Sequence, residues 1–348
     1  MLPAETPTAE RTGGVIDRQE ACASILICRP NTRLGNTLLM TPLVEELETA
    51  LPGARVEILT ACPAAHEIFR QFPNVRRVHQ LPFRGVRHPL RHLLTVLRVR
   101  RTRYDVIVDP CPRSWTSRFL TRLLAARTKV GFTSGSKREG IDIGIPFQGA
   151  PPHMGAYPVY LLRRALLRRE ERAVAEEFPA LNLRLTESER RFGREELERL
   201  TSRGATGPVV AVATHATGPK RFEVSWWRRM IERLRELVPA AQVIEIRPPS
   251  GVAALPELPA YFSRRVRQVG AVIEAASCFV CADSGLMHLA AATDTVTVGL
   301  FKVTEPRLYA PRRGASCAVT ASDSAPERVA ERIAGLLGAV SPADAAAH

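Results

Sequence analysis

Short runs of β-branched and aliphatic residues alternate with segments of helical periodicity along most of the chain. This alternation is typical of βαβ units, in which helices cover the faces of a parallel sheet. In the first half we predict strands at Ile25–Arg29, Arg55–Thr60, Asp105–Asp109 and Lys129–Phe132. The helices predicted between and after these strands are Asn36–Ala50, Pro63–Gln71, Pro89–Arg101, Ser114–Ala126 and Ala156–Arg169.

The pattern restarts in the second half, after a connecting region between Glu170 and Gly207. This region contains a predicted extended piece at Ala180–Leu185 and a charged helix that begins at Thr186. Further strands are predicted at Val209–Thr214, Gln242–Ile246, Phe279–Ala282, Val296–Phe301 and Ser316–Thr320. Further helices are predicted at Val224–Leu237, Val269–Ser277, Leu286–Ala292 and Ala325–Leu337.

Two such series predict an α/β protein with two Rossmann-like, doubly wound domains that face a cleft. A chain of 348 residues is long enough for two hydrophobic cores. In sheets of this kind, ligands bind at the carboxyl ends of the strands. The expected divisions are a flexible N-terminal tail at 1–23, a first α/β domain at 24–175, a linker region at 176–206, a second α/β domain at 207–322, and a C-terminal helix and tail at 323–348.

Composition excludes several classes of protein. With 45% hydrophobic and 24% charged residues, the chain is not mainly disordered, and its apolar runs are too short to cross a bilayer. Residues 1–20 lack the apolar core of a secretory signal. The seven cysteines are scattered, and Cys278 and Cys281 lie in an apolar run without a second pair to complete a zinc site. We therefore expect buried thiols and a reducing, cytoplasmic location.

Charge is unevenly distributed along the chain. Residues 1–170 contain 26 basic and 14 acidic side chains, a net charge of +12, whereas the remaining residues contain 23 and 21, a net charge of +2. A basic first half predicts an anionic partner. Nucleic acid, an anionic membrane surface and a phosphorylated saccharide all fit this observation.

The first strand-to-helix junction combines a glycine with cationic side chains. Gly35 allows close approach of the backbone, and Arg29 and Arg33 add positive charge beside the predicted helix start. An ordinary glycine-containing loop with solvated arginines accounts equally well for this segment.

A second junction follows the strand that begins at Val209. Here Thr217, Gly218 and Lys220 place a hydroxyl, a glycine and a cation near a helix start, which would suit a diphosphate group. A lysine in a loop is usually only solvated, so this segment alone is merely suggestive.

The third junction is the sharpest of the three. Asp283 and Ser284 can cap the following helix and leave its first N–H groups directed at a ligand, and His288 lies one turn further on. The ordinary alternatives are simple N-capping for Asp283 and Ser284, and a core histidine for His288.

Taken together, these segments resemble glycosyltransferase family 9, the ADP-heptose:lipopolysaccharide heptosyltransferases and their relatives. The run 282–292, followed by Thr297–Phe301 and Thr304-Glu305-Pro306, resembles the family's Asp-(Ser/Thr)-Gly-x-x-His-Leu-x-Ala-Ala signature. His215–Thr217 with Lys220, Phe222 and Trp227 resembles its second motif, and Leu34–Thr37 with Thr41-Pro42 its Leu-Gly-Asp…Thr-Pro start. The resemblance implies a GT-B fold and a nucleotide-sugar donor in the second domain. The donor-binding residues it implies are Thr217, Gly218, Lys220, Asp283, Ser284, Gly285, Leu286 and His288. On the first-domain, acceptor side we expect Arg29, Arg33, Gly35 and Glu139.

One position departs from the family pattern. Asn36 stands where the family commonly has an aspartate that acts as general base, and an amide cannot accept a proton near neutral pH. Another carboxylate could take the proton, with Asp109 as first candidate and Glu139 as second. Alternatively the acceptor needs little help, or the chain binds the donor with little turnover.

The expected reaction is a single in-line displacement at the anomeric carbon, which inverts its configuration. Lys220, Thr217 and the helix start at Ser284–Gly285 would stabilise the leaving ADP. The chain has no Asp-x-Asp motif, and the resemblance implies a reaction without a metal or other cofactor.

Residues 88–98 form a further segment of interest, with Leu90, Leu93, Leu94 and Leu97 on one helical face. The ordinary expectation is that these leucines pack on the sheet while arginines face solvent. The alternative is a surface for an anionic, lipid-linked acceptor at the inner membrane, which the resemblance implies as partner; no nucleic-acid-binding module is recognisable. The arginines that could contribute are Arg84, Arg87, Arg91, Arg98, Arg100, Arg101, Arg103, Arg163, Arg164, Arg168 and Arg169.

Overall fold

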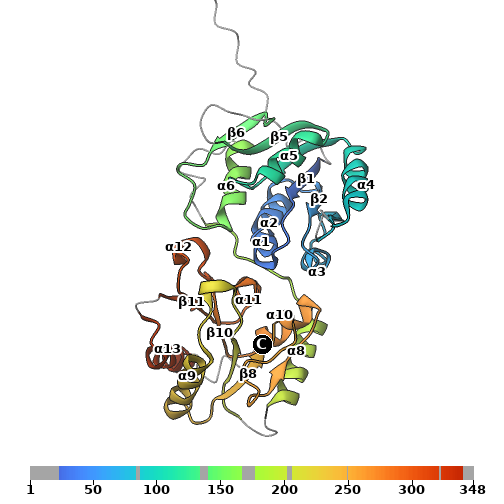
Figure 1. Cartoon of the computed structure of the whole chain (residues 1–348). Coiled ribbons are helices and arrows are strands. Elements are labelled where there is room, and N and C mark those ends of the chain that lie inside the picture. Colours follow the sequence, from blue (N-terminus) through green and yellow to red (C-terminus); the bar gives the residue numbers. More distant parts are fainter. Residues whose placement is uncertain are drawn as a thin grey trace, which may run out of the picture.

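The computed structural model contains two six-stranded parallel sheets, one in each half of the chain (Figure 1). The structure describes residues 23–83, 87–133, 140–166, 177–201, 206–248, 250–320 and 323–339. The predicted tail at 1–23 lies outside the described residues except for Ala23. The predicted pair of doubly wound α/β domains is confirmed.

The first sheet has the order β3-β2-β1-β4-β5-β6, so its first strand is central. Ile25, Leu26 and Ile27 are fully buried in a continuous apolar run, because helices cover both faces of a parallel sheet. The strands are β1 (Ser24–Arg29), β2 (Arg55–Thr60), β3 (Val75–Gln80), β4 (Tyr104–Asp109), β5 (Ala126–Thr133) and β6 (Ile143–Pro146).

Two cores form on opposite faces of this sheet. Ile25 and Ile27 pack in one core with Leu43 and Leu161, whereas Leu26 packs in the other. Val96, Val99, Leu120 and Leu124 complete that second core. The helices are α1 (Leu34–Leu38), α2 (Thr41–Ala50), α3 (Ala65–Ile68), α4 (Pro89–Arg100), α5 (Trp115–Leu123) and α6 (Ala156–Ala165).

The second sheet repeats this topology with the order β12-β11-β10-β7-β8-β9. In both sheets the first and fourth strands are neighbours, the arrangement that creates a ligand-binding crevice. The strands are β7 (Val209–Ala213), β8 (Gln242–Ile246), β9 (Ala260–Tyr261), β10 (Cys278–Ala282), β11 (Thr297–Phe301) and β12 (Cys317–Thr320).

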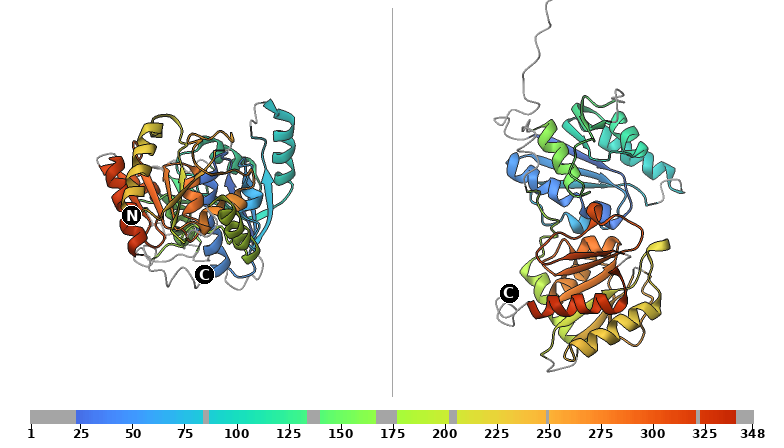
Figure 2. Two further views of the ribbon diagram at one scale, coloured as in Figure 1. Left: turned by 90° about the horizontal axis from the view of Figure 1, so that it is seen from below. Right: turned by 90° about the vertical axis from the view of Figure 1, so that its left-hand side faces the viewer.

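The helices of the second half pack around this sheet, with α9 and α13 side by side (Figure 2). The Thr186 hydroxyl and the Glu189 carboxylate form a capping box at the start of α8, which confirms the predicted helix start. The helical elements are α8 (Glu187–Leu200), the 3₁₀ turn η2 (Gly218–Lys220), α9 (Val224–Leu237), α10 (Val266–Ala275), α11 (Gly285–Ala290), α12 (Pro306–Tyr309) and α13 (Pro326–Ala339).

Several sequence-based boundaries were wrong. The single helix predicted at Asn36–Ala50 is two helices, because Pro42 lies in the first turn of α2 and starts a new helix. Residues 180–185, predicted as an extended piece, form no helix or strand. The prediction missed α12 and the strands β3, β6 and β9. Charged residues interrupt the apolar pattern of β3, and β6 and β9 are short, so their signals are weak.

The cysteines of the described residues are all free. Cys278 and Cys281 are buried in β10, as predicted, and so are Cys28, Cys62 and Cys111. Among the described helices, none combines the length and apolar character that a membrane crossing requires.

Candidate active site

Lys220 and Asp283 form an ion pair at the carboxyl edge of the second sheet. Lys220 Nζ lies 2.5 Å from Asp283 Oδ2, and the Thr304 hydroxyl donates a 2.5 Å hydrogen bond to the same oxygen. The Asp283 side chain is 5% exposed, whereas 27% of the Lys220 side chain is exposed. A buried carboxylate therefore holds a lysine whose side chain remains partly exposed.

The chain brings this pair together through two neighbouring strands. Lys220 follows β7 and Asp283 follows β10, and these strands pair so that Ala213 lies opposite Cys281. Gly218 has a φ of +59°, a left-handed conformation that favours glycine at the start of η2. The loops thus converge at the point where the strand order reverses, the place where α/β sheets bind ligands.

An open hollow of about 620 Å³ lies between η2 and the residues after β11. Cations from both sides, Arg221 and Lys302, line it. The hollow is as large as the pockets that bind small ligands, which occupy roughly 300–1,000 Å³. Its remaining lining residues are Gly218, Pro219, Glu223 and Val303.

The expected N-capping by Asp283 and Ser284 is wrong. Ser284 occupies the N-cap position of α11 without a side-chain capping bond, and Lys220 and Thr304 engage the Asp283 carboxylate instead. Ser284 Oγ is buried and has no hydrogen-bond partner among the described residues. The site therefore contains a hydroxyl whose hydrogen-bonding capacity is unused within the described part of the chain.

His288 and Gly35 bring the two domains into contact. A Cβ atom at Gly35 would overlap the His288 ring, and one at Gly285 would lie 3.2 Å from Leu34 Cβ. Both glycines therefore let α1 and α11 approach closely where the domains meet. The close approach expected at Gly35 is present, but its neighbour is a histidine of the other domain.

The buried His288 ring is neutral at physiological pH. Burial lowers the pKa of His288 to about 4; the Asp283 carboxylate opposes this shift and the Lys220 ammonium adds to it. His288 also forms an edge contact with the ring of Tyr309, so its surroundings are those of a packed interface residue.

The arginines expected on the acceptor side occupy different environments. Arg33 is exposed before α1, whereas Arg29 is 8% exposed and donates a hydrogen bond from Nη1 to Cys111 Sγ at 3.0 Å. Asn36 is half-buried in α1, and we find no side-chain hydrogen bond for it among the described residues. Glu139 lies outside the described residues.

The structure argues against Asp109 as the general base. Its side chain is fully buried and accepts hydrogen bonds from the Ser117 hydroxyl at 2.6 Å, from Arg118 Nε at 3.0 Å and from the Cys111 backbone at 3.2 Å. Burial raises the pKa of Asp109, while Ser117 and Arg118 oppose this shift. A carboxylate sealed in this way cannot reach the hydroxyl of a bound acceptor.

The comparisons with known proteins agree with this geometry. The sequence model described as glycosyltransferase family 9 (heptosyltransferase) matches residues 264–336, which include Asp283, Ser284 and His288. The chain is 27% identical to lipopolysaccharide heptosyltransferase 1 of Pseudomonas aeruginosa, over 78% of this chain and 77% of that protein. It is 22% identical to lipopolysaccharide heptosyltransferase 3 of Escherichia coli K12, over 80% and 82%.

The chain is thus similar to glycosyltransferase family 9 in sequence. It is a glycosyltransferase. The solved structure of E. coli ADP-heptose lps heptosyltransferase II superimposes with a TM-score of 0.71 at 18% identity, covering 91% of this chain and 99% of that one. The expected GT-B architecture is thereby confirmed.

Two polar residues of this glycosyltransferase site had no role in the sequence analysis. Thr304 belongs to the segment that follows the family signature, but nothing local indicates that it binds Asp283. Glu245 is fully buried in β8 and accepts hydrogen bonds from the Thr214 hydroxyl and from the backbone N–H groups of Ala254 and Leu255. It thereby fixes the end of β7, from which the Lys220 loop departs.

The other expected donor-binding residues lie on the same two loops. Thr217 is exposed immediately before η2, and Leu286 is half-buried in the first turn of α11. Within the part of the chain that the structure describes, no cluster of three or more His, Cys, Asp or Glu side chains could hold a metal ion.

Proposed function

We propose that this glycosyltransferase transfers a heptose from ADP-heptose to the inner core of lipopolysaccharide, with inversion at the anomeric carbon and without a metal ion. The observation that carries the proposal is the fixed, solvent-accessible Lys220 ammonium beside Asp283 and Thr304. The names of the relatives, which include an ADP-heptose transferase, support the choice of donor and acceptor.

In this proposal the second domain, expected at 207–322, binds the donor. The diphosphate would lie against the exposed face of Lys220 and accept a hydrogen bond from the orphan hydroxyl of Ser284. Asp283 and Thr304 do not need to touch the donor, because they hold Lys220 in position. Gly218 and Thr217 would supply backbone and hydroxyl donors from the same loop.

The chemistry is one displacement. An acceptor oxygen forms a bond to the anomeric carbon while the bond to the diphosphate oxygen breaks, and the hydroxyl proton passes to solvent or a base. Negative charge develops on the leaving ADP, and Lys220 stabilises that charge in a partly buried site where electrostatic interactions are strong. This stabilisation is the role that a metal ion has in many other transferases.

The first domain, expected at 24–175, would bind the acceptor beside α1. Arg33 is exposed there and could contact an anionic saccharide. Arg29 is buried and would act only indirectly, through its hydrogen bond to Cys111 Sγ. Asn36 can orient the acceptor hydroxyl but cannot take its proton. Because Asp109 is fully buried, Glu139 remains as the candidate base. The simpler alternative is that the acceptor hydroxyl loses its proton to solvent, without help from a protein base.

A second candidate function is a donor-binding relative with little turnover. The observation that favours it is the pair formed by an amide at Asn36 and a fully buried Asp109. A protein or a small metabolite as acceptor is a further alternative for the same site.

Two measurements test the proposal and separate these candidates. Calorimetric titration with ADP should show binding to the wild-type chain and loss of binding for Lys220→Ala. Release of ADP from ADP-heptose, with heptose-lacking core lipid as acceptor, should then report turnover. Binding without release would favour the donor-binding relative, and absence of ADP binding would contradict both functions.

Asn36→Asp gives a sharper test of the base. If the aspartate restores general-base assistance, which is typically worth ~10²–10⁴ in rate, turnover should rise markedly. The matched control is Asn36→Ala, which should remove any orienting hydrogen bond and lower turnover. An unchanged rate in Asn36→Asp would show that the proton leaves by another route.

A further inference from the structure

The leucine row of α4 faces solvent. Leu90, Leu93, Leu94 and Leu97 follow the i, i+3, i+4, i+7 spacing of one helical face, and Leu90 is 74% exposed. The face toward the sheet is formed by Val96 and Val99 instead, so the expectation that the leucines pack on the sheet is wrong. An apolar face of this length on an outer helix has no explanation in the folding of the domain.

A second apolar row lies on α5. Trp115, Phe119 and Leu123 follow an i, i+4, i+8 spacing, and Trp115 is 81% exposed. The opposite side of α5 contributes Leu120 to the core beneath α4. Both helices therefore cover the same face of the first sheet (Figure 1). Their outer sides carry large exposed apolar residues.

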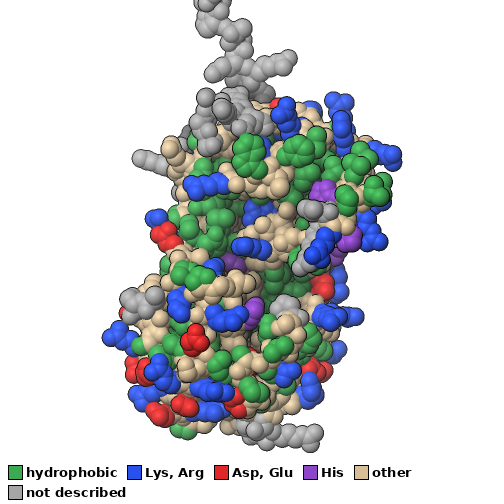
Figure 3. Space-filling model, in the orientation of Figure 1, with side chains coloured by type: hydrophobic (Ala, Val, Ile, Leu, Met, Phe, Trp, Pro, Cys, Tyr) green, Lys and Arg blue, Asp and Glu red, His purple; other side chains and the backbone are tan. Residues whose placement is uncertain are grey.

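The charges around these rows have one sign. The sequence contains no Asp or Glu from 68 to 104 or from 110 to 138. Arg91 and Arg98 flank the leucine row on one side and Arg100 on the other, and Figure 3 shows basic and hydrophobic side chains intermingled over α4. The exposed arginines of this region include Arg87, Arg91, Arg98, Arg100, Arg101, Arg103, Arg113 and Arg122.

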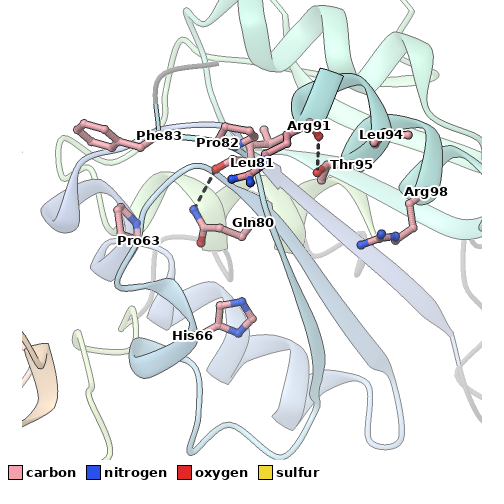
Figure 4. Close-up of a pocket in the computed structure, with 10 residues that line it drawn as sticks. All are labelled: Pro63, His66, Gln80, Leu81, Pro82, Phe83, Arg91, Leu94, Thr95 and Arg98. Atoms are coloured by element: carbon pink, nitrogen blue, oxygen red, sulfur yellow. Dashed lines mark hydrogen bonds between the residues drawn. The ribbon is translucent and has the colours of Figure 1, made fainter. Parts of the chain in front are cut away.

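An open hollow of about 540 Å³ adjoins α4 on the side of Arg91 and Arg98 (Figure 4). Phe83 and Leu94 line it together with these arginines, and no acidic side chain belongs to its lining. Figure 4 shows His66 and Gln80 on its other side, and Gln80 Oε1 is buried without a partner among the described residues. The hollow can admit a small anionic group beside an apolar surface.

Not all the arginines of the first domain belong to this surface. Arg163 is buried and forms an ion pair with Glu46 at 2.7 Å, so its expected contribution to the same field is wrong. Arg84, Arg168 and Arg169 lie outside the described residues.

We propose that the outer faces of α4 and α5 form a docking surface for an anionic lipid bilayer. The leucine row and Trp115 would enter the boundary between headgroups and acyl chains, and the flanking arginines would contact lipid phosphates. Nucleic acid would account for the arginines but not for seven exposed apolar side chains in two rows. A bilayer satisfies both features, because it presents negative charge and an apolar interior together. This surface goes beyond the proposed function, since it needs neither donor nor turnover.

Vesicle sedimentation tests the proposal. The full chain should sediment with vesicles of phosphatidylcholine and phosphatidylglycerol, much less with phosphatidylcholine alone, and binding should weaken at high salt. Leu93→Ser/Leu94→Ser should lower binding at least about tenfold, because two apolar side chains leave the interface. The matched control, Val252→Ser, changes an exposed apolar residue of the second domain and should bind as wild type.

Tryptophan emission gives an independent measurement on α5. Trp115 is the most exposed tryptophan, since Trp226 is half-buried and Trp227 is fully buried. Its emission should shift to shorter wavelength when anionic vesicles are added, and Trp115→Phe should abolish the shift.

Three outcomes would overturn the proposal. These are equal binding to neutral and anionic vesicles, binding that the leucine changes leave intact, and binding of duplex DNA that the same leucine changes abolish. ADP binding by calorimetry should remain normal in the Leu93→Ser/Leu94→Ser variant. Failure of this proposal is therefore distinguishable from failure of the proposed function.

Discussion

Asp109 and Asp283 occupy corresponding places in the two domains. Each lies at the carboxyl end of the fourth strand of its sheet, beside the first strand, and each is almost fully buried. Asp109 binds Ser117 and Arg118 of the helix that follows it, inside its own domain. Asp283 instead binds Lys220 and Thr304, which come from two other loops at the edge of the sheet.

The two domains share one topology, yet the aspartate at the end of the fourth strand has a different role in each domain. Asp109 holds the first turn of α5, whereas Asp283 holds Lys220, whose side chain remains partly exposed. The second domain therefore has a preformed polar site. In the first domain, exposed arginines gather on the outer helix α4.

Lys220→Ala should have the largest effect. If this ammonium group faces the leaving diphosphate, as we propose, its removal should lower kcat/KM by about 10²–10³-fold, as loss of one transition-state donor typically does. The measurement is ADP release with saturating acceptor. Arg229→Ala, which removes an exposed cation from α9, serves as the matched control and should turn over normally. A normal rate in Lys220→Ala would show that the ammonium group held by Asp283 does not contribute to turnover.

Asp109→Asn should act on stability rather than on chemistry. The change leaves the Arg118 guanidinium without its buried counter-charge, and it should lower the free energy of unfolding by about 3 kcal/mol. Urea denaturation measures this loss. Asp283→Asn provides the contrast, because it should lower turnover with a smaller loss of stability. Equal effects of both substitutions would mean that the two carboxylates do not differ in role.

Gly35→Ala tests the contact between the domains. The added methyl group would overlap the His288 ring, and overpacking of this kind costs about 1–3 kcal/mol. In the double variant Gly35→Ala/His288→Ala the clash is absent, so the two changes should couple in a double-mutant cycle followed by thermal unfolding. Additive effects would show that the helices separate easily at this point.

The pH dependence of stability should reveal two buried, neutral histidines at the contact between the domains, His288 and His153. His153 is 7% exposed, and its Nε2 lies 3.1 Å from the Ala310 carbonyl oxygen. Burial lowers the pKa of His288 and of His153 to about 4, so the unfolded chain binds these protons first as the pH falls. Stability should therefore be complete above about pH 6.5 and fall towards pH 4, by up to about 1.4 kcal/mol per pH unit for each histidine. Denaturation between pH 7 and 5 measures the slope, since most carboxylates titrate lower. His288→Gln should flatten it, and an unchanged slope would contradict a buried neutral ring.

Much of the second half could be predicted because its signals are local. The run from Ala282 to Ala292 specifies both a strand-to-helix junction and a family signature, and the helix at Val224–Leu237 has the predicted bounds. The convergence of Lys220 with Asp283 follows from the pairing of β7 with β10. By contrast, the hydrogen bond from Thr304 to Asp283 could not be predicted, because no local pattern encodes the position of the loop that contains Thr304.

The first domain was less predictable. A leucine row at helical spacing normally faces a core, yet α4 turns Val96 and Val99 inward and leaves the leucines outside. The burial of Asp109 likewise depends on Ser117 and Arg118, whose side chains reach it only because α5 packs on the sheet. Such contacts depend on which helix face meets the sheet.

By itself, the amino-acid sequence determined the alternation of strands and helices, the two doubly wound domains and the strand-to-helix junction at residues 282–292, since periodicity and turn chemistry act over a few residues. Only the tertiary structure decided that Asp109 is buried and that Asp283 binds Lys220. It also decided that Gly35 packs against the His288 ring and that the apolar rows of α4 and α5 face solvent. Those outcomes depend on contacts between residues that are far apart in the chain. The energies of these contacts depend on burial, and side chains become buried only when the helices pack on the sheets.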